Sequence, residues 1–411
     1  MSSLQENVRN HRRRTGMSQE QLAEAAGLSV GAVRKVEQGG SARVETLHML
    51  ARALGTTTSS LFVTEAPEPV RENNGDSVKL MELRRALMPP IGLSEVVVEP
   101  EQATDLADLQ RAIDETQSLY RADRYDSVAK RLPGILRAAE ATVGVSEEGE
   151  SRQRAVIVRA CAFFLAGKYL TQVRRNDMAY HALSQGIRDA RETGQTLLAA
   201  TGVVGMGWLL LRQDRFDEVE RLSSVTAAEV EPRMSDASPG QLAVWGELCQ
   251  RVASAAMRNN RPDVAKEARR MVATAASALD VEHTDFRQHW GTFGPVTAEL
   301  KAIEDLCLVG DARGVLRRAD EGLVGSKALK RFGRPSAINW DRHRLDVARA
   351  HVTLGSHQDA MQELNTIRRT APEWIKHQPM AGHIMSDILA RRKRTLTQDM
   401  REMATHLGVS G

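Results

Sequence analysis

Residues 17–39 read MSQEQLAEAAGLSVGAVRKVEQG, a stretch that predicts two short helices joined by a tight turn. Ser18 is a good N-cap for the first helix, and Gln21, three residues later, completes a capping box. Gly27 stands where the first helix must end in a left-handed backbone conformation. Ser29 caps the second helix. The stretch therefore predicts a helix-turn-helix.

The excess positive charge of the chain is concentrated near its N-terminus. The 411 residues carry a net charge of +3. Residues 1–62 hold eight basic and five acidic side chains, so they account for that whole excess. Such asymmetry points to an anionic partner for this part of the chain. Together with the two short helices, it indicates the kind of helix-turn-helix that binds DNA.

The first 62 residues resemble the Cro and phage-repressor (XRE) family of helix-turn-helix domains. The resemblance rests on eight residues: Gln19, Leu22, Ala23, Gly27, Ser29, Val33, Glu37 and Gly39. It implies an all-α, five-helix DNA-binding domain over residues 1–64, whose recognition helix begins near Ser29 and enters the major groove. Arg12 and Glu37 match a family pair that joins the first helix to the recognition helix, which is a structural role. A helix-turn-helix that only packs, as in scaffold proteins, is the alternative.

The same resemblance implies which residues contact double-stranded DNA: Gln19, Ser29, Val30, Gly31, Arg34, Lys35, Gln38 and Arg43. Val30 and Gly31 stand where the family often has polar residues, and Val30 could touch a thymine methyl group. Base hydrogen bonding is therefore expected from Arg34 and Lys35, whose long cationic side chains suit guanine. Ser29, Gln38 and Arg43 match phosphate-contact positions, and Gln19 matches a glutamine that bonds a phosphate or a base.

Residues 65–104 are predicted to form a linker with one short helix. The beginning of this stretch is rich in Pro, Glu, Asn and Gly and has no periodicity. An amphipathic helix is expected near residues 77–87, and two prolines at 89–90 stop it.

Residues 105–411 show helical periodicity almost to the end of the chain, with no convincing strand pattern. Polar turns recur near residues 122–124, 175–177, 213–215, 259–261, 310–311 and 355–356. An amphipathic segment follows each turn. The pattern predicts about six helical hairpins and a final helix near residues 380–406, stacked into a coil with a concave surface. The whole chain is therefore expected to be all-α.

These hairpins resemble degenerate tetratricopeptide repeats, with a non-repeating helical bundle as the alternative. Segments such as 294–297 and 371–378 are similar to those of actinobacterial regulators that join a repressor-type head to such repeats. The resemblance implies a homodimer that binds a two-fold operator. The lack of a disulfide framework separately predicts a location in the reducing cytoplasm. It also implies that the repeats bind an effector, either a small molecule or a peptide, which modulates DNA binding. A regulator whose repeats bind a protein partner, with no small effector, is the alternative.

Four residues beside Gly and Pro breaks are expected to line an effector pocket: Trp290, Phe293, Asn339 and Trp340. Packing of these aromatic residues in the core is the alternative interpretation.

No catalytic residue, cofactor or metal ligand set is predicted, and an enzyme is the least favoured class. Residues 27–31 fit the G-x-S-x-G pattern of hydrolases, but that chemistry needs a strand before the serine. His283, Asp285 and His289 lie close in sequence but lack a further strong ligand at helical spacing. Three isolated cysteines predict no disulfide framework. No apolar run is long enough for a transmembrane helix.

Overall fold

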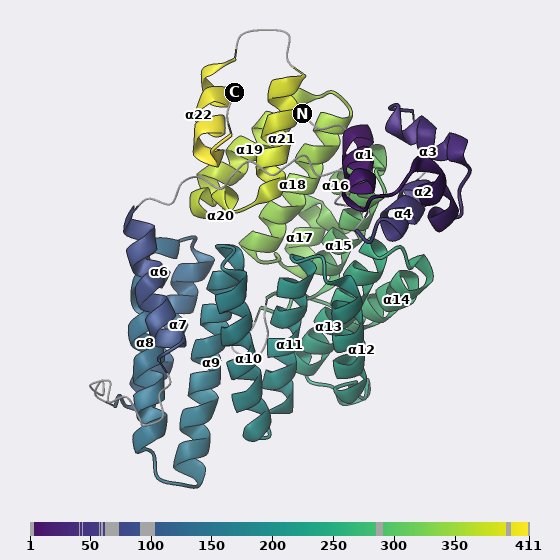
Figure 1. Ribbon diagram of the computed structural model, residues 1–411. Coiled ribbons are helices and arrows are strands. Elements are labelled where there is room, and N and C mark those ends of the chain that lie inside the picture. Colours follow the sequence, from purple (N-terminus) through teal and green to yellow (C-terminus); the bar gives the residue numbers. More distant parts are fainter. Residues whose placement is uncertain are drawn as a thin grey trace.

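The computed structural model describes residues 4–40, 42, 44–56, 58, 61, 74–90, 103–284, 291–391 and 396–409. Over these residues the chain is all-α, as predicted (Figure 1). Extended pairing within them is limited to an isolated antiparallel bridge between His283 and Phe293. Among the same residues, no helix has the length and apolar character needed to cross a membrane.

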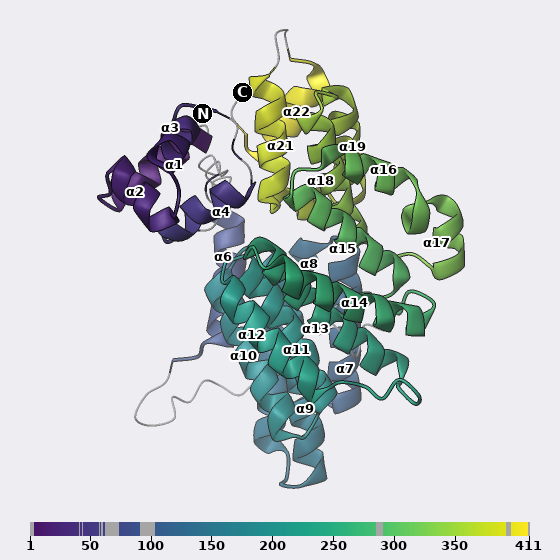
Figure 2. The same cartoon turned by 90° about the vertical axis from the view of Figure 1, so that its right-hand side faces the viewer.

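The N-terminal unit, called the head below, contains four described helices: α1 (Leu4–Arg14), α2 (Gln19–Ala26), α3 (Val30–Glu37) and α4 (Val44–Ala53). The fifth helix expected for this unit falls near residues 57–62, where several residues lie outside the described part. Apolar side chains from all four helices form a core of their own, with Val8, Leu22, Val33 and Leu50 fully buried. The four helices form one cluster, which Figure 2 shows beside the remaining helices.

The predicted caps of the head helices are present. The Ser18 hydroxyl accepts a hydrogen bond from the Gln21 backbone N–H at 3.1 Å, and the Gln21 side chain accepts one from the Ser18 N–H at 2.8 Å. Gly27 has φ 64°, in the left-handed region that glycine adopts without steric cost. The Ser29 hydroxyl accepts from the Ala32 N–H at 3.2 Å. Local sequence therefore determines both the length of α2 and the start of α3.

The helix expected near residues 77–87 is α6 (Asn74–Leu87), and it packs against α8. Leu83 and Leu87 are buried in the same core as the helices that follow. Lys79 forms an ion pair with Asp126, with 2.9 Å between nitrogen and oxygen. The helix is therefore packed on the large C-terminal unit, called the body below. Residues 62–73 and 91–102 lie outside the described part.

The first four hairpins of the body stand side by side in Figure 1. They pair α7 (Leu106–Arg121) with α8 (Tyr125–Val145), α9 (Glu150–Gln172) with α10 (Asn176–Glu192), α11 (Thr196–Leu211) with α12 (Phe216–Glu229), and α13 (Pro239–Arg258) with α14 (Pro262–Leu279). Two more hairpins follow within the described residues, which confirms the predicted number.

The C-terminal half of the body contains the fifth and sixth hairpins and several short helices. Its elements are α15 (Pro295–Leu308), α16 (Ala312–Asp320), η1 (Gly322–Val324), α17 (Ser326–Phe332), α18 (Ala337–Thr353), α19 (His357–Thr370), α20 (Pro372–Lys376), α21 (Pro379–Ala390) and α22 (Gln398–Leu407). The hairpins are α15–α16 and α18–α19. The prediction of one final helix over 380–406 was wrong, because α21 ends at Ala390 and Thr397 caps a new helix.

Each hairpin turn contains one residue in the left-handed backbone region: Asp123, Arg174, Asp214, Asn260, Gly310 and Gly355. A left-handed residue lets the chain leave one helix and begin an antiparallel one at once. The first helices of successive hairpins also contact one another, from α7 through α9, α11, α13 and α15 to α18. This succession forms one continuous inner layer of helices.

The C-terminal end of the body packs back onto its first hairpin. The Asp123 carboxylate, in the α7–α8 turn, accepts hydrogen bonds from the backbone N–H groups of Glu373 and Trp374 at 2.7 and 2.8 Å. The Tyr125 ring stacks on His377, with 6.4 Å between ring centroids. Burial raises the pKa of Asp123 to about 6, against the opposing effect of these two hydrogen bonds. The contact joins segments 250 residues apart in the chain.

Candidate nucleic-acid interface

One face of α3 is exposed and carries half of the residues expected to contact DNA. Gly31, Arg34, Lys35 and Gln38 are all exposed, and their spacing places them on one side of the helix. The opposite side is buried in the core of the head. An exposed polar helix face preceded by a capped turn is the form of a recognition helix.

The two residues at the beginning of α3 differ in exposure. Val30 is half-buried and packs against the core of the head, so part of its side chain is unavailable to DNA. A side chain at Gly31 would meet the Ser29 hydroxyl at 3.9 Å, so the space in front of this residue is open. The first turn of α3 therefore presents backbone and a small hydroxyl, and longer side chains follow from Arg34 onward.

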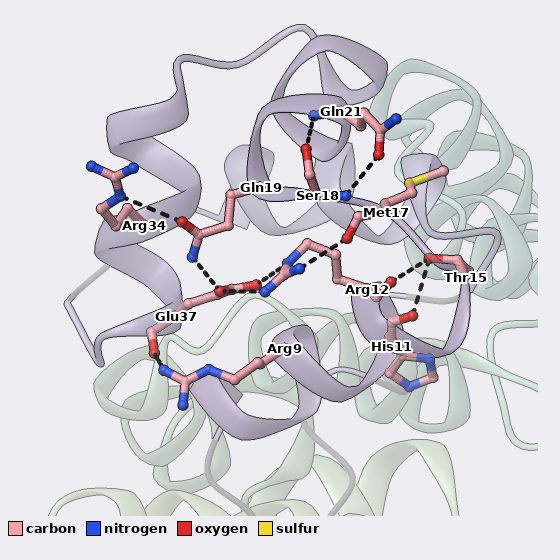
Figure 3. Close-up of polar contacts among 10 residues, drawn as sticks. All are labelled: Arg9, His11, Arg12, Thr15, Met17, Ser18, Gln19, Gln21, Arg34 and Glu37. Atoms are coloured by element: carbon pink, nitrogen blue, oxygen red, sulfur yellow. Dashed lines mark hydrogen bonds and ion pairs between the residues drawn. The ribbon is translucent and has the colours of Figure 1, made fainter.

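Arg12 and Glu37 join α1 to the recognition helix by a buried, bidentate ion pair (Figure 3). The Arg12 Nε lies 2.6 Å from Glu37 Oε1, and its Nη2 lies 3.1 Å from Oε2. The third nitrogen, Nη1, donates to the Met17 carbonyl at 2.9 Å. Burial by itself raises the pKa of Glu37, but hydrogen bonds from Arg12 and Gln19 outweigh it, and the pKa is lowered overall. Glu37 is therefore held as a carboxylate.

Gln19 connects this pair to the exposed face of α3. Its side-chain nitrogen donates to Glu37 Oε2 at 2.6 Å, and its oxygen accepts from Arg34 Nε at 3.4 Å (Figure 3). Arg9 adds a further link by donating to the Glu37 carbonyl at 2.8 Å. The resemblance assigned Gln19 to DNA contact, whereas the structure also gives it a role in orienting Arg34. The part played by Arg9 has no signal in the sequence, because it depends on how α1 crosses α3.

The other expected contact residues lie near the C-terminal end of α3. The aliphatic part of Lys35 lies over Gly40, where an added Cβ would be 2.5 Å from Lys35 Cγ. Gly40 therefore leaves room for this side chain. Arg43 lies outside the described residues.

A second candidate site is a cavity of about 190 Å³ inside the body. Its lining is drawn from the inner layer of helices: Gln117, Tyr120 and Arg121 of α7, Lys168 and Gln172 of α9, Trp208 of α11, Glu247, Gln250 and Arg251 of α13, Lys301 of α15, and Ala337, Ile338, Asn339 and Arg342 of α18. Gly291 and Ser336 complete the lining. All six hairpins thus contribute their first helix to this cavity.

Of the four residues expected to line an effector pocket, Asn339 lies in this lining. Phe293 is fully buried, and its ring packs against Gly246 in the core. Trp340 packs in a hydrophobic cluster, with its ring 5.8 Å from that of His343. Trp290 lies outside the described residues. The structure therefore places Phe293 and Trp340 in cores instead of the cavity lining.

Sequence reasoning missed Trp208 and the buried cations of the cavity. Trp208 lies in an almost entirely apolar helix, far from any Gly–Pro break. Lys168 offered a usable signal, because it interrupts the apolar run FFLAGKYL at residues 163–170. Lysine is rarely fully buried unless it is paired, so a lysine in such a run marks a polar site.

Comparison with known proteins identifies the head only. A helix-turn-helix family model matches residues 8–61, which span α1 to α4. No curated protein matches the chain. The N-terminal part of the chain is thus an XRE-type helix-turn-helix, the DNA-binding unit of transcriptional regulators. This assignment agrees with the exposed face of α3 and the ion pair that holds it.

Proposed function

We propose that the protein is a sequence-specific transcriptional regulator whose body dimerises and binds an effector that modulates operator binding. The proposal divides the chain into a DNA-binding domain over residues 1–64, a linker over 65–104, and a sensor and dimerisation domain over 105–411. The observation that carries it is the exposed face of α3, supported from behind by the buried Arg12–Glu37 pair. Residues that read DNA need such support, because small displacements of a recognition helix break base contacts.

In this proposal Arg34 provides the main base contact. Its side chain is 56% exposed, and Gln19 holds its Nε. Its Nη2 lies 4.0 Å from an oxygen of the exposed Glu20 carboxylate, so a base would compete with this long ion pair. Two parallel N–H groups of arginine match O6 and N7 of guanine. Lys35 is a second base contact, whereas Ser29, Gln38 and Arg43 contact phosphates. Val30 adds an apolar contact with its exposed part.

The body supports the regulatory half of the proposal by its arrangement around one cavity. We propose that its hairpins are tetratricopeptide-like repeats and that the cavity is the effector site. Because every hairpin contributes to the lining, a bound molecule would contact the whole inner layer at once. Such contacts can favour one curvature of the body and so alter the positions of two heads in a dimer. A coupling of about 1–3 kcal/mol between effector and DNA is sufficient for regulation.

The test is fluorescence anisotropy with the full-length protein. Duplexes selected from random DNA are compared with scrambled duplexes at ~0.15 M salt, since affinity depends steeply on salt. We expect a preference of roughly 10³-fold or more. Equal binding to selected and scrambled duplexes would refute sequence-specific recognition. Light scattering tests the dimer, for which the mass should be twice the 45.3 kDa of one chain.

A further inference from the structure

Positive charge dominates the cavity of the body. Five cationic side chains line it: Arg121, Lys168, Arg251, Lys301 and Arg342. Glu247 is the one acidic residue among its described lining residues. Lys168 and Arg251 are each 6% exposed, and Lys301 is 7% exposed. Buried like charges repel one another strongly in a medium of low dielectric constant, so such a cluster needs negative charge nearby.

Several of these cations lie close to the indole ring of Trp208. The guanidinium of Arg342 lies 4.4 Å from the centre of the indole ring. Arg251 and Lys301 each lie 5.5 Å from it, and Arg212 lies 5.9 Å from it. Cation–π attraction holds these side chains close to the ring but leaves their net charge unchanged. Four positive groups therefore remain within 6 Å of one aromatic side chain.

The surrounding acids compensate only part of this charge. Glu304 accepts from Lys301 Nζ at 2.6 Å and also pairs with Arg258. Asp346, from the neighbouring α18, is buried in the same group, and burial raises its pKa to about 7. Burial also lowers the pKa of Lys168 to about 8. Glu304 and Asp346 also attract the charge of Arg342, and Glu247 and Glu304 attract that of Arg251. These few acids are therefore shared among more cations than they can neutralise.

Nη2 of Arg342 and Oε1 of Gln250 are among the buried polar atoms of the lining that have no hydrogen-bond partner within the described part of the chain. Arg251 uses its Nε for the Val204 carbonyl at 3.2 Å. A buried donor without an acceptor is costly, and a charged donor more so. Nη2 of Arg342 therefore lacks a hydrogen-bond acceptor, and an oxygen atom of an anionic ligand would supply one.

The remainder of the lining combines neutral polar residues, such as Gln117, Gln172 and Ser336, with apolar and aromatic ones. Ile338 and Ala337 of α18 face the cavity together with Trp208 and Tyr120. A volume of about 190 Å³ suits a small molecule and not a folded partner. The site thus combines a cationic side, which suits an acidic group, with a side that suits a carbon framework.

We infer that this cavity binds a small organic anion, whose carboxylate or phosphate group contacts Arg342 and Arg251 and whose apolar part packs on Trp208 and Ile338. The inference rests on the proposed function, because it names the chemical class of the effector. Ligand binding neutralises the repulsion among cations contributed by α13 and α18. The bound state of the body is thereby the more compact and more stable one.

Isothermal titration calorimetry on the full-length protein tests this inference with three probes: benzoate, phenyl phosphate and neutral benzyl alcohol. We expect one binding site per chain for at least one anion and none for benzyl alcohol. Binding of benzoate alone identifies a carboxylate site, and binding of phenyl phosphate alone identifies a phosphate site. Binding of neither anion, or equal binding of the neutral probe, overturns the inference.

The matched variants are Arg342→Gln in the cavity and Lys266→Gln on the exposed surface of α14. Loss of a charged hydrogen bond should weaken anion binding roughly ten- to hundredfold in R342Q and leave K266Q unchanged. Arg251→Gln is the second cavity variant, used if circular dichroism shows that R342Q is unfolded. If the folded cavity variant and K266Q bind the anion with equal affinity, the anion does not bind in this cavity and the inference is refuted.

DNA anisotropy with and without the bound probe separates this inference from the proposed function. An anion that binds without changing DNA affinity supports the cavity site and refutes its regulatory role. Specific DNA binding without any anion binding supports the regulator and refutes the cavity inference.

Discussion

Replacing Glu37 by alanine should loosen the head without affecting the body. Glu37 is 1% exposed and accepts hydrogen bonds from Arg12 at 2.6 and 3.1 Å and from Gln19 at 2.6 Å. Removing one partner of a buried pair leaves the other charge without compensation, which typically costs 3–5 kcal/mol. The Arg12 side chain is 13% exposed and keeps the Met17 carbonyl, so we expect a loss of ~2–4 kcal/mol.

Hydrogen–deuterium exchange measured by mass spectrometry is the suitable assay. All five tryptophans lie at residue 208 or beyond, so tryptophan fluorescence reports on the body and not on the head. The expected loss corresponds to roughly 30- to 700-fold faster exchange in peptides from α1 and α3 of the full-length protein. The fluorescence-detected melting temperature of the body should stay unchanged.

Glu24→Ala is the matched control, because it removes an acid from the exposed surface of α2. Exchange rates in Glu37→Ala equal to those of this control would refute the structural role of the pair. The pH dependence gives an independent check. The pKa of Glu37 is lowered in the folded head, so the pair stabilises the head above the unfolded pKa. That stability is lost as the pH falls through the folded pKa.

Three further predictions concern DNA readout, packing and pH. Arg34→Ala should weaken binding to selected duplexes by ~1–3 kcal/mol in anisotropy, and an equal loss on random DNA would make it a phosphate contact. Gly246→Ala would force a Cβ into the Phe293 ring, so calorimetric melting should show a loss of ~1–3 kcal/mol, whereas Gly134→Ala meets no neighbour and should not destabilise. The raised pKa of Asp123 means that the folded body holds this proton longer than the unfolded chain does. Stability measured by urea unfolding should therefore fall as the pH rises from about 4 to about 6, and this component should vanish in Asp123→Asn.

Interactions between near neighbours in sequence made the head predictable. The Ser18–Gln21 capping box and the left-handed Gly27 involve residues at most four positions apart, so their residue types are sufficient to indicate them. The same reasoning explains the turns of the body. Asp123 and Gly310 end helices by local backbone hydrogen bonds, and the six predicted turns match the six hairpins within the described residues.

Contacts between elements that are far apart in the sequence could not be predicted from local sequence patterns. The Gln19 link between Glu37 and Arg34 depends on the angle at which α2 crosses α3. The expected pocket aromatics Phe293 and Trp340 pack in cores, because neighbouring Gly and Pro residues indicate a chain break but not which side of it faces a cavity. Nothing in the sequence near α20 indicates that Asp123 caps its backbone 250 residues away.

The sequence by itself determined the all-α class, the helix-turn-helix and the number of hairpins, because caps, turns and apolar periodicity act within one or two helical turns. The tertiary structure alone decided where the cavity lies and which charges surround it. Lys168 and Arg342 are 174 positions apart and line the same cavity only because the six inner helices are arranged around it. The burial of these cations and the repulsion between them depend on that arrangement. It results from many contacts between helices and cannot be read from any single segment.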